Sequence, residues 1–371
     1  MYARSFQKAL NSRVSSYFFY ERLAMSFDKV SFEETLGTSV VASGKCIGCG
    51  ACVVVCPFNC LEYMKEGPNL VKECQVCGIC AQVCPKYEWS WPKVEDFVFG
   101  RERKAEEEFG VYRRLVVARA VDDGMVKLCQ DGGVVTALLL FALENGLIDS
   151  AVVSGISPEK PLYPAPRLAT TYEEILECAG TRYFYSPNIL ALTEGIKQKK
   201  TSTAFVGTPC QIRAIRKMQM CGLKKHTKPL MFLIGLMCSE CFTYEGLAEK
   251  HIRDTLGLNL NDITKINIKG KILVKTKSEV RTIPLATAKQ YGRKSCRFCD
   301  DFSSELADIS TGGLGLDGWT FIIIRTERGE NLFSNAEKAG HLYVKTVDAE
   351  TYALNLLAKL SRKKRKTREV C

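Results

Sequence analysis

The chain has 371 residues, of which 46% are apolar, and its 52 Lys and Arg against 41 Asp and Glu give a formal net charge of +11. A chain of this length can bury a substantial core, and we expect two or three domains. Its 18 cysteines do not indicate a disulfide-stapled secreted scaffold, because such proteins are much shorter, and no apolar run reaches the roughly 18 residues that span a bilayer. We therefore expect a protein of the reducing cytoplasm.

Residues 1–40 form a predicted N-terminal arm that begins basic, aromatic and poor in acids. A targeting peptide is one interpretation, although the segment lacks the apolar core and the cleavage site of a secretory signal. A true start at Met25 and a helical arm that docks on a partner are the alternatives. The sequence does not choose among the three.

Residues 41–88 contain two tandem copies of C-x2-C-x2-C-x3-C-P, the second beginning at Cys74, 28 residues after Cys46. This is the ligand pattern of a ferredoxin with two [4Fe–4S] clusters, in which the fourth cysteine of each run ligates the other cluster. A zinc module or a disulfide framework is the alternative, but two complete runs in tandem argue against both. The predicted ligands are Cys46, Cys49, Cys52 and Cys84 for one cluster, and Cys74, Cys77, Cys80 and Cys56 for the other.

Prolines and glycines stand where such ligand loops need them. Pro57 and Pro85 end the two loops, because proline fixes φ and removes an N–H donor. Gly48, Gly50 and Gly78 allow the backbone to approach a cluster and to turn its amides inward.

The next part of the chain, residues 89–112, is a charged and aromatic linker that we expect to wrap over another surface. From 113 to 360, short apolar strands alternate with amphipathic helices, which predicts one α/β or α+β domain. Strands are predicted at 114–121, 150–156, 203–207, 229–237, 263–270, 271–278 and 320–326, with a hairpin turn at Gly270-Lys271. Helices are predicted at 132–146, 172–180, 188–200, 210–220, 244–258 and 351–364.

A basic tail of residues 361–371 follows, in which 362–368 read RKKRKTR. We interpret this run as a frayed helix end rather than as a nucleic-acid site. A cluster- or zinc-bearing nucleic-acid protein is the alternative, but no nucleic-acid-binding fold signature accompanies the run. The overall positive charge indicates either a solvated basic surface or an anionic ligand or partner.

Five cysteines in the predicted α/β part also suggest a metal site. Cys238 and Cys241 form one C-x2-C pair, Cys296 and Cys299 form another, and Cys210 stands between a predicted strand and a helix. The spacing fits a four-cysteine zinc knot or a third iron–sulfur cluster, and we favour the cluster in a chain that already carries two. Spacing alone leaves open whether Cys210 or Cys241 is the fourth ligand.

Three loops are candidates for binding an organic cofactor. The segment 130–133, QDGG, opens a helix whose free amides could hold a phosphate, unless Asp131 simply caps that helix. The segment 180–187, GTRYFYSP, could stack a flat ring while Arg182 meets a phosphate, or it could be a structured loop. The glycine-rich segment 310–319, STGGLGLDGW, lets a ligand touch the backbone, although no GxGxxG with a following helix is present.

Taken together, six segments resemble the family of beta subunits of coenzyme F420-reducing hydrogenase and the F420-linked formate dehydrogenases. The resemblance covers residues 113–360, and the appended two-cluster module is most like the input subunit of archaeal F420 dehydrogenase complexes. The segments are QDGGVVTALL, AGTRYFYSPN, GTPCQIRAIRKM, GLMCSECF, KSCRFCDDF and ELADISTGGLGLDGWTFIIIRT.

This resemblance implies an α+β protein in which a ferredoxin-like domain with two [4Fe–4S] clusters joins an α/β domain that binds FAD, coenzyme F420 and one more [4Fe–4S] cluster. It implies Cys210, Cys238, Cys296 and Cys299 as the ligands of that third cluster, with Cys241 as a bystander. The candidate cofactor-binding residues are Gln130, Asp131, Gly132, Gly133, Gly180, Thr181, Arg182, Tyr183, Ser186, Gly207, Thr208, Gly312, Gly313, Gly318 and Trp319.

The implied activity is hydride exchange with coenzyme F420, which the flavin converts into single electrons for three clusters. No acid–base catalytic residue is required. We expect a cytoplasmic subunit, or one peripheral on a membrane complex, whose partner is a formate or formylmethanofuran dehydrogenase, a hydrogenase, a heterodisulfide reductase or a membrane F420 dehydrogenase. The alternative is a non-catalytic ferredoxin-type adaptor without an active flavin site.

Overall fold

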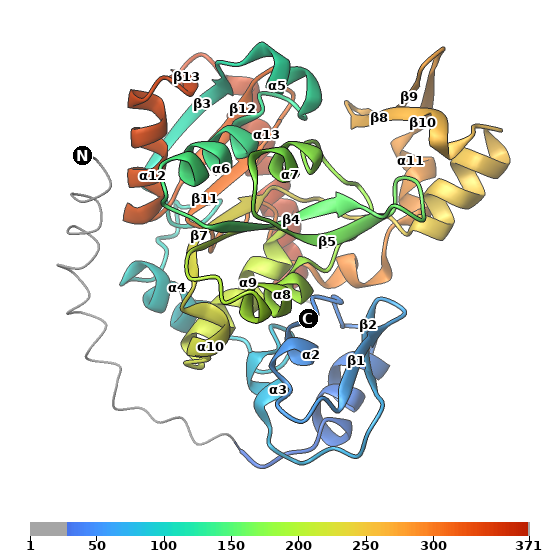
Figure 1. Cartoon of the computed structure of the whole chain (residues 1–371), viewed down its shortest axis with the longest axis vertical. Helices are drawn as coiled ribbons and strands as arrows, with labels where there is room; N and C mark the ends of the chain where they lie inside the picture. Colours follow the sequence, from blue (N-terminus) through green and yellow to red (C-terminus); the bar gives the residue numbers. More distant parts are fainter. Residues whose placement is uncertain (1–27, 370–371) are drawn as a thin grey trace.

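The computed structural model describes residues 28–369 (Figure 1). Residues 1–27 of the predicted N-terminal arm and the last two residues of the predicted tail lie outside the described residues. We call residues 28–88 the N-terminal module, residues 89–110 the connector and residues 111–369 the large domain. In Figure 1 the module lies at the bottom, in blue, beneath the large domain.

Each cysteine run of the N-terminal module folds into a short helix that begins after a left-handed glycine. Gly50, with a φ of 81°, precedes the first helix, and Gly78, with a φ of 71°, precedes the second. Each helix stops at an extended cysteine directly before a proline, because a following proline disfavours helical backbone. The elements of the module are η2 (Glu33–Ala42), α2 (Ala51–Val55), β1 (Leu61–Met64), β2 (Gly67–Leu70) and α3 (Ile79–Val83).

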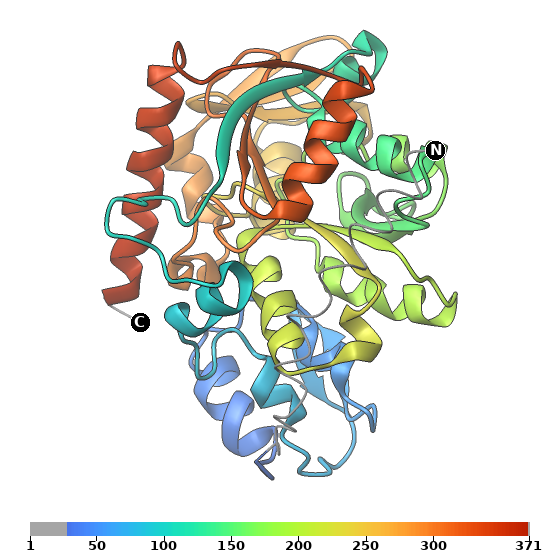
Figure 2. The same ribbon diagram turned by 90° about the vertical axis from the view of Figure 1, so that its left-hand side faces the viewer.

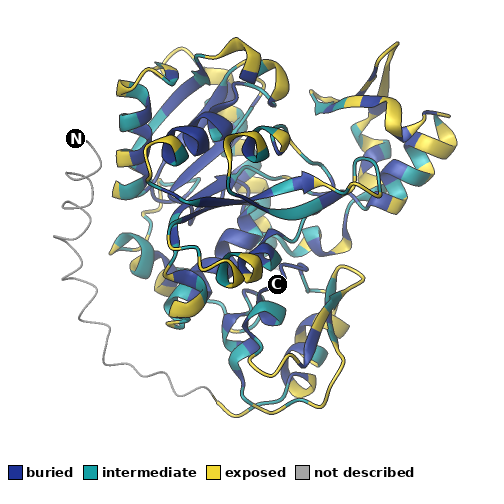
Figure 3. Ribbon diagram, in the orientation of Figure 1, coloured by how far each residue is buried: buried dark blue, intermediate teal, exposed yellow. Residues whose placement is uncertain are grey.

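An eight-stranded mixed sheet forms the centre of the large domain, in the order β13-β3-β12-β11-β7-β6-β4-β5. The middle strands β11, β7, β6 and β4 run parallel, whereas β12, β3 and β13 on one side and β5 on the other pair antiparallel. Figure 3 shows these strands largely in the colour of buried residues. They are β3 (Arg114–Ala120), β4 (Ser150–Ile156), β5 (Pro164–Ala169), β6 (Thr203–Gly207), β7 (Leu230–Leu236), β11 (Ile309–Gly312), β12 (Thr320–Ile324) and β13 (Leu342–Lys345).

Helices cover both faces of this sheet. One apolar cluster joins α6, α7 and α12 to one face, and a second joins η3, α8 and α9 to the other. The second cluster also contains Ile47, Val55 and Val83, so the N-terminal module shares a core with the large domain. The helices are α5 (Asp123–Leu128), α6 (Val134–Glu144), α7 (Tyr172–Glu177), η3 (Asn188–Ala191), α8 (Leu192–Lys197), α9 (Pro209–Met220), α10 (Lys224–Thr227), α12 (Glu327–Lys338), α13 (Thr351–Arg365) and η8 (Lys366–Glu369).

A small antiparallel sheet projects from the large domain, at the upper right of Figure 1. The predicted hairpin is present, but Lys269 and Gly270 form its turn because the second strand already begins at Lys271. A third strand, not predicted, completes the sheet. The elements here are η4 (Tyr244–Thr255), η5 (Leu260–Asp262), β8 (Ile263–Ile268), β9 (Lys271–Thr276), β10 (Val280–Pro284), α11 (Leu285–Ala288), η6 (Lys289–Tyr291) and η7 (Lys294–Phe298).

The connector, which contains α4 (Trp91–Phe99), is fastened to the large domain by buried charges. Arg103 pairs with Glu95 of α4 and, at 2.6 Å, with the almost fully buried Glu305. Because breaking a buried ion pair leaves an uncompensated charge, this network fixes the path of the connector. The prediction that this segment wraps over another surface is confirmed.

The basic C-terminal run is not a frayed end, contrary to our interpretation. Figure 2 shows α13 running along the edge of the large domain with its C-terminal end near the connector. Arg362 pairs with Glu108 at 2.6 Å, and Arg365 pairs with Glu305 at 3.1 Å. Two arginines of the run are therefore paired, one with the connector and one with Glu305, whereas Lys363 and Lys366 are exposed.

Most predicted strands and helices of the large domain are confirmed within a few residues, whereas α5, α10, α12, β5, β11 and β13 were not predicted. The predicted helix at 244–258 is present as the π-helix η4. Among residues 28–369, no helix combines the length and the apolar character needed to cross a membrane.

Candidate functional site

The N-terminal module brings its cysteines together in the crossed grouping that the sequence predicts. Burial raises the pKa of Cys80 to about 12, and the neighbouring charges of Cys77, Cys74 and Cys56 add to the rise. Cys56 belongs to the first run, so the crossing is present in the fold. Clustered buried thiols hold their protons tightly, and positive iron is what would convert them into thiolates.

The cysteines of the second set, Cys46, Cys49, Cys52 and Cys84, also lie near one another. Burial raises the pKa of the Cys49 thiol, and charge interactions with Cys84 and Cys46 raise it further. Cys52 interacts in the same way with Cys49, Cys84 and Cys46, and also with Cys80 of the other set. The two sets therefore adjoin each other within the module.

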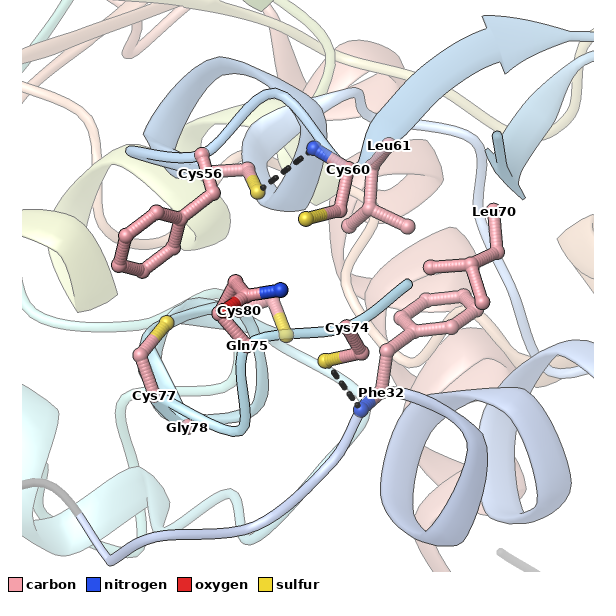
Figure 4. A pocket seen from close by; sticks show the side chains of 11 residues that line it. Phe32, Cys56, Cys60, Leu61, Leu70, Cys74, Gln75, Cys77, Gly78 and Cys80 are labelled. Carbon is pink, nitrogen blue, oxygen red and sulfur yellow. Dashed lines mark hydrogen bonds between the residues drawn. The ribbon is translucent and has the colours of Figure 1, made fainter. Parts of the chain in front are cut away.

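Figure 4 shows the pocket enclosed by the Cys80 set, with the sulfurs of Cys56, Cys74, Cys77 and Cys80 around a common space. Its empty volume is about 330 Å³. The backbone N–H of Phe32 donates to Cys74 Sγ at 3.4 Å, and that of Cys60 donates to Cys56 Sγ at 3.3 Å. Such N–H donors stabilise charge on cluster sulfurs.

The described residues do not form a site for a single metal ion. Within residues 28–369, no group of three or more His, Cys, Asp or Glu converges closely enough to hold a single metal ion. A structural zinc requires four ligands about 2.3 Å from one centre. The cysteine spacing, with two complete C-x2-C-x2-C-x3-C-P runs, favours iron–sulfur clusters.

A second sulfur-lined pocket, of about 340 Å³, lies in the large domain beside the module, and we call it the domain pocket. It is lined by cysteines from the start of α9, the loop after β7, and η7 with the residue that follows it. Cys238 Sγ lies 4.0 Å from Cys241 Sγ, and the N–H of Cys241 donates to Cys296 Sγ at 3.5 Å. All five candidate cysteines line this pocket: Cys210, Cys238, Cys241, Cys296 and Cys299.

Two cations also line the domain pocket, and sequence reasoning missed both. Arg293 precedes Cys296 by three residues, and Lys364 comes from the basic run at the end of α13. Lys364 Nζ donates to the carbonyl of Cys296 at 3.3 Å. The sequence carries no signal that would have linked a C-terminal lysine to this pocket, because the contact depends on where α13 docks.

Parts of the three candidate cofactor loops converge at the N-terminal end of α6. Gly133, with a φ of 72°, is the N-cap residue of α6, and Asp131 does not cap this helix, so the capping alternative is wrong. A Cβ on Gly313 would lie 2.3 Å from Asp131 Oδ2, which places the glycine-rich loop directly against the QDGG segment. Lys269 in the hairpin turn pairs with Asp317 of the same loop.

Gly132 is required by packing rather than by a ligand. A Cβ at this position would lie 2.7 Å from the carbonyl oxygen of Ala118 and 2.9 Å from Thr320 Oγ1. The N–H of Gly132 donates to Thr320 Oγ1 at 3.0 Å. The segment is therefore anchored between β3 and β12, and the free amides of α6 lie next to it.

Unpaired polar atoms at this place suit an anionic group. Burial lowers the pKa of Arg182, whose Nη1 donates a 3.1 Å hydrogen bond to the carbonyl of Ala179. Arg182 Nε and Gln130 Nε2 are buried and have no hydrogen-bond partner among the described residues. Buried donors without partners are costly, and a phosphate would satisfy them.

The remaining predicted cofactor residues are divided between two places. Gly207, Thr208 and Ser186 lie on the side of the domain pocket, where Thr208 Oγ1 is 3.2 Å from Cys210 Sγ. Trp319 packs with α13 on the face of the sheet away from α6, with Lys345 Nζ 4.5 Å from its ring centroid. Thr181 is exposed, and Gly180, Gly312 and Gly318 shape the loops, Gly180 with a φ of 90° and Gly318 with a φ of 68°.

Comparisons with known proteins agree with this architecture. Residues 115–193 and 200–350 match the N-terminal and C-terminal family profiles of the coenzyme F420 hydrogenase/dehydrogenase beta subunit. Residues 40–62 match the profile of the 4Fe-4S binding domain.

Two relatives align with most of the chain. The chain is 40% identical, over 70% of its length and 94% of the relative's, to the beta subunit of coenzyme F420 hydrogenase of Methanothermobacter thermautotrophicus. It is 31% identical, over 88% of its length and 91% of the relative's, to a subunit of the F(420)H(2) dehydrogenase of Methanosarcina mazei.

A solved structure shares the fold. A chain of the F420-reducing [NiFe] hydrogenase complex from Methanosarcina barkeri superposes with a TM-score of 0.68 at 35% identity. The match covers 72% of this chain and 93% of that one. From its iron–sulfur module, its family profiles and this fold, the chain belongs to the family of the coenzyme F420 hydrogenase/dehydrogenase beta subunit.

Proposed function

We propose that the chain is an iron–sulfur flavoprotein subunit that exchanges a hydride with coenzyme F420 through FAD. It passes single electrons along three [4Fe–4S] clusters to or from a partner oxidoreductase. Bound FAD supplies the conversion between a two-electron hydride and single electrons. The chain's own residues bind the cofactors, orient them and keep them close together. The predicted boundaries of the domains, at 40, 88, 112 and 360, belong to this proposal.

One observation carries the proposal: the segment 180–187 contacts both candidate sites. Its first half lies near the QDGG segment, since a Cβ on Gly180 would be 3.4 Å from the carbonyl oxygen of Leu128, and it supplies Arg182, whose unpaired Nε favours an anionic group. Its second half supplies Tyr185, which lines the domain pocket. A cofactor that meets Arg182 is therefore separated from the cysteines of the pocket by a few residues of one loop.

The cysteines also favour a definite order of clusters. Cys49 and Cys210 pack in the same apolar cluster, so the domain pocket adjoins the Cys49 set of the module. Cys52 of that set packs with Cys80 of the next in another cluster. Electrons would pass from the domain pocket to the Cys49 set and then to the Cys80 set, which lies farthest from the flavin.

We assign the domain cluster to Cys210, Cys238, Cys296 and Cys299. Cys210 lines the domain pocket together with the other three, and the resemblance to the family favours it as the fourth ligand. Cys241 contributes its backbone N–H to the Cys296 sulfur, a supporting role that needs no bond to iron.

The partner in this proposal is another subunit of a redox complex, because the named relatives are themselves subunits of hydrogenase and dehydrogenase enzymes. The candidates are a formate or formylmethanofuran dehydrogenase, a hydrogenase, a heterodisulfide reductase or a membrane F420 dehydrogenase. We propose a cytoplasmic location, peripheral to the membrane where the partner is a membrane complex.

The test is an anaerobic assay of the purified full chain with reduced coenzyme F420 and a viologen dye, together with the FAD released on denaturation. Turnover and released FAD are expected, and Arg182→Met should lower FAD occupancy, whereas the exposed Arg113→Met should not. Clusters without releasable FAD or turnover would favour the alternative, an electron-transfer adaptor. Unchanged FAD occupancy in Arg182→Met would remove this residue from the cofactor site.

A further inference from the structure

A single arginine occupies the boundary between the domain pocket and the N-terminal module. The side chain of Arg293 is 5% exposed although it belongs to a loop of the large domain. Its Nε donates to Glu66 Oε2 at 2.9 Å, and its Nη1 donates to the carbonyl of Ile47, next to Cys46, at 3.3 Å. At the same time Arg293 lines the domain pocket and precedes Cys296 by three residues.

The guanidinium also lies on an aromatic ring that fills the space between the two cysteine sets. Its Cζ is 3.8 Å from the ring centroid of Tyr185, and Tyr185 lines the domain pocket together with Cys210 and with Ile47 of the module. Packing is tight here, since a Cβ on Gly48 would lie 2.9 Å from Arg293 Nη2. The arginine and the tyrosine therefore fix the distance between the two sets.

The charge of Arg293 reaches both cysteine sets. Arg293 lines the domain pocket together with Cys210 and Cys296, and its Nη1 donates to the carbonyl of Ile47, the residue that follows Cys46. An arginine is protonated at every physiological pH, so this charge is permanent. A fixed cation beside a buried cluster favours the more negative, reduced state of that cluster.

Two neighbouring charged residues each lie next to only one of the two cysteine sets, so their variants can be compared with those of Arg293. Lys364 interacts with Cys299, Cys238 and Cys296 of the domain pocket. Glu66 interacts with Arg293 from the module side and is 42% exposed.

We propose that Arg293 is a positioning residue shared by two clusters, the one in the domain pocket and the one held by Cys46, Cys49, Cys52 and Cys84. It raises the reduction potentials of both together and holds the module against the pocket, so that one electron passes directly between them. In that step one cluster loses an electron as its neighbour gains it, and no bond or proton moves. The inference rests on the proposed function, because both clusters must be present.

The experiment is an anaerobic redox titration of the full-length, cluster-loaded chain, followed by EPR, with iron analysis of every variant. Arg293→Gln is expected to shift two of the three midpoint potentials to lower values. Lys364→Met should lower only one of them, and Glu66→Gln should raise one. Arg293→Lys keeps the positive charge but loses the planar guanidinium group. Its midpoint potentials should therefore be closer to those of the wild type than the potentials of Arg293→Gln are.

The outcomes separate this inference from the proposed function. A wild-type chain with fewer than three clusters contradicts the proposed function itself. If Arg293→Gln keeps its three clusters but only one midpoint potential shifts, or none does, the shared role of Arg293 is overturned. If Arg293→Gln does not retain its iron, Arg293→Lys and Glu66→Gln decide the question. The inference is overturned if Glu66→Gln has wild-type potentials. It is also overturned if both cluster potentials fall in Arg293→Lys, because that variant keeps the positive charge.

Discussion

The two cysteine-rich regions of this chain are assembled in different ways. In the N-terminal module, residues 46–85 supply every sulfur, and the loops are shaped by the glycines and prolines inside the same stretch. The domain pocket instead draws its cysteines from three segments between residues 210 and 299, and one lining cation from α13. The first site is therefore encoded locally, whereas the second exists only when the large sheet and its helices are in place.

This difference predicts which changes each site tolerates. A local site depends on its own spacing, and a long-range site depends on distant packing as well as on its ligands. Single substitutions can therefore test the ligands of a site and its distant packing separately.

Cys210→Ser should remove the domain cluster, because it deletes the one sulfur that α9 contributes. We expect iron content to fall by about four atoms per chain and F420-linked viologen reduction to fall at least about tenfold. Iron analysis and anaerobic turnover measure both. Cys241→Ser is the matched control, and a loss of iron in Cys241→Ser but not in Cys210→Ser would reverse our ligand assignment.

Arg213→Met should loosen the attachment of the connector to the large domain. Arg213 pairs with the buried Asp300, and its guanidinium lies 4.2 Å from the ring centroid of Trp89. Breaking a buried pair costs about 3–5 kcal/mol, so the apparent melting temperature should fall. The exposed pair of Arg253 and Asp254 gives the control Arg253→Met, which should leave the apparent melting temperature almost unchanged. Equal losses in the two variants would contradict the role of Arg213.

Gly313→Ala should disturb the convergence of the cofactor loops without touching any cysteine. The added Cβ would meet Asp131 Oδ2 at 2.3 Å, and overpacking of this kind costs about 1–3 kcal/mol. We expect lower FAD occupancy with unchanged iron, measured on the same preparation. Gly195→Ala is the control, because its Cβ would have no neighbour closer than 3.7 Å. Full FAD occupancy in Gly313→Ala would show that the loop can move away without consequence.

Thr320→Val tests the anchor of the QDGG segment and should have the smallest effect. It leaves the buried N–H of Gly132 without its 3.0 Å partner, at a cost of about 1–3 kcal/mol. Thermal stability and FAD retention during gel filtration should both decline slightly. The exposed Thr264→Val serves as the reference, and the account of the anchor fails if both variants behave alike.

The sequence allowed close prediction of the parts that depend on local rules. The crossed grouping of Cys56 with Cys80 follows from ligand spacing, and β4 and β6 follow from continuous apolar runs. In contrast, β5 reads PAPRLA, and its two prolines hide an edge strand from any pattern of apolar residues. The helix α12 was missed because its sequence, ERGENLFSNAEK, is mostly polar, although Phe333 is fully buried.

The candidate sites likewise contain residues that could be predicted from the sequence and residues that could not. The cysteines of the domain pocket were recognisable by type, but nothing in the sequence near Lys364 connects it with them, and the position of Arg293 three residues before Cys296 does not show that its side chain lines the pocket. Their positions follow from the docking of α13 and from the contact of Arg293 with Glu66 of the module. Charges that serve a site from a distance can be identified only in the folded chain.

The most direct test of the central claim is an anaerobic titration of the fully loaded chain with reduced coenzyme F420, followed by flavin absorbance and by EPR. The account predicts that each added molecule delivers about two electrons, which bleach the flavin and appear as reduced-cluster spins. Clusters that dithionite reduces but that remain oxidised in the presence of excess reduced coenzyme F420 would contradict it.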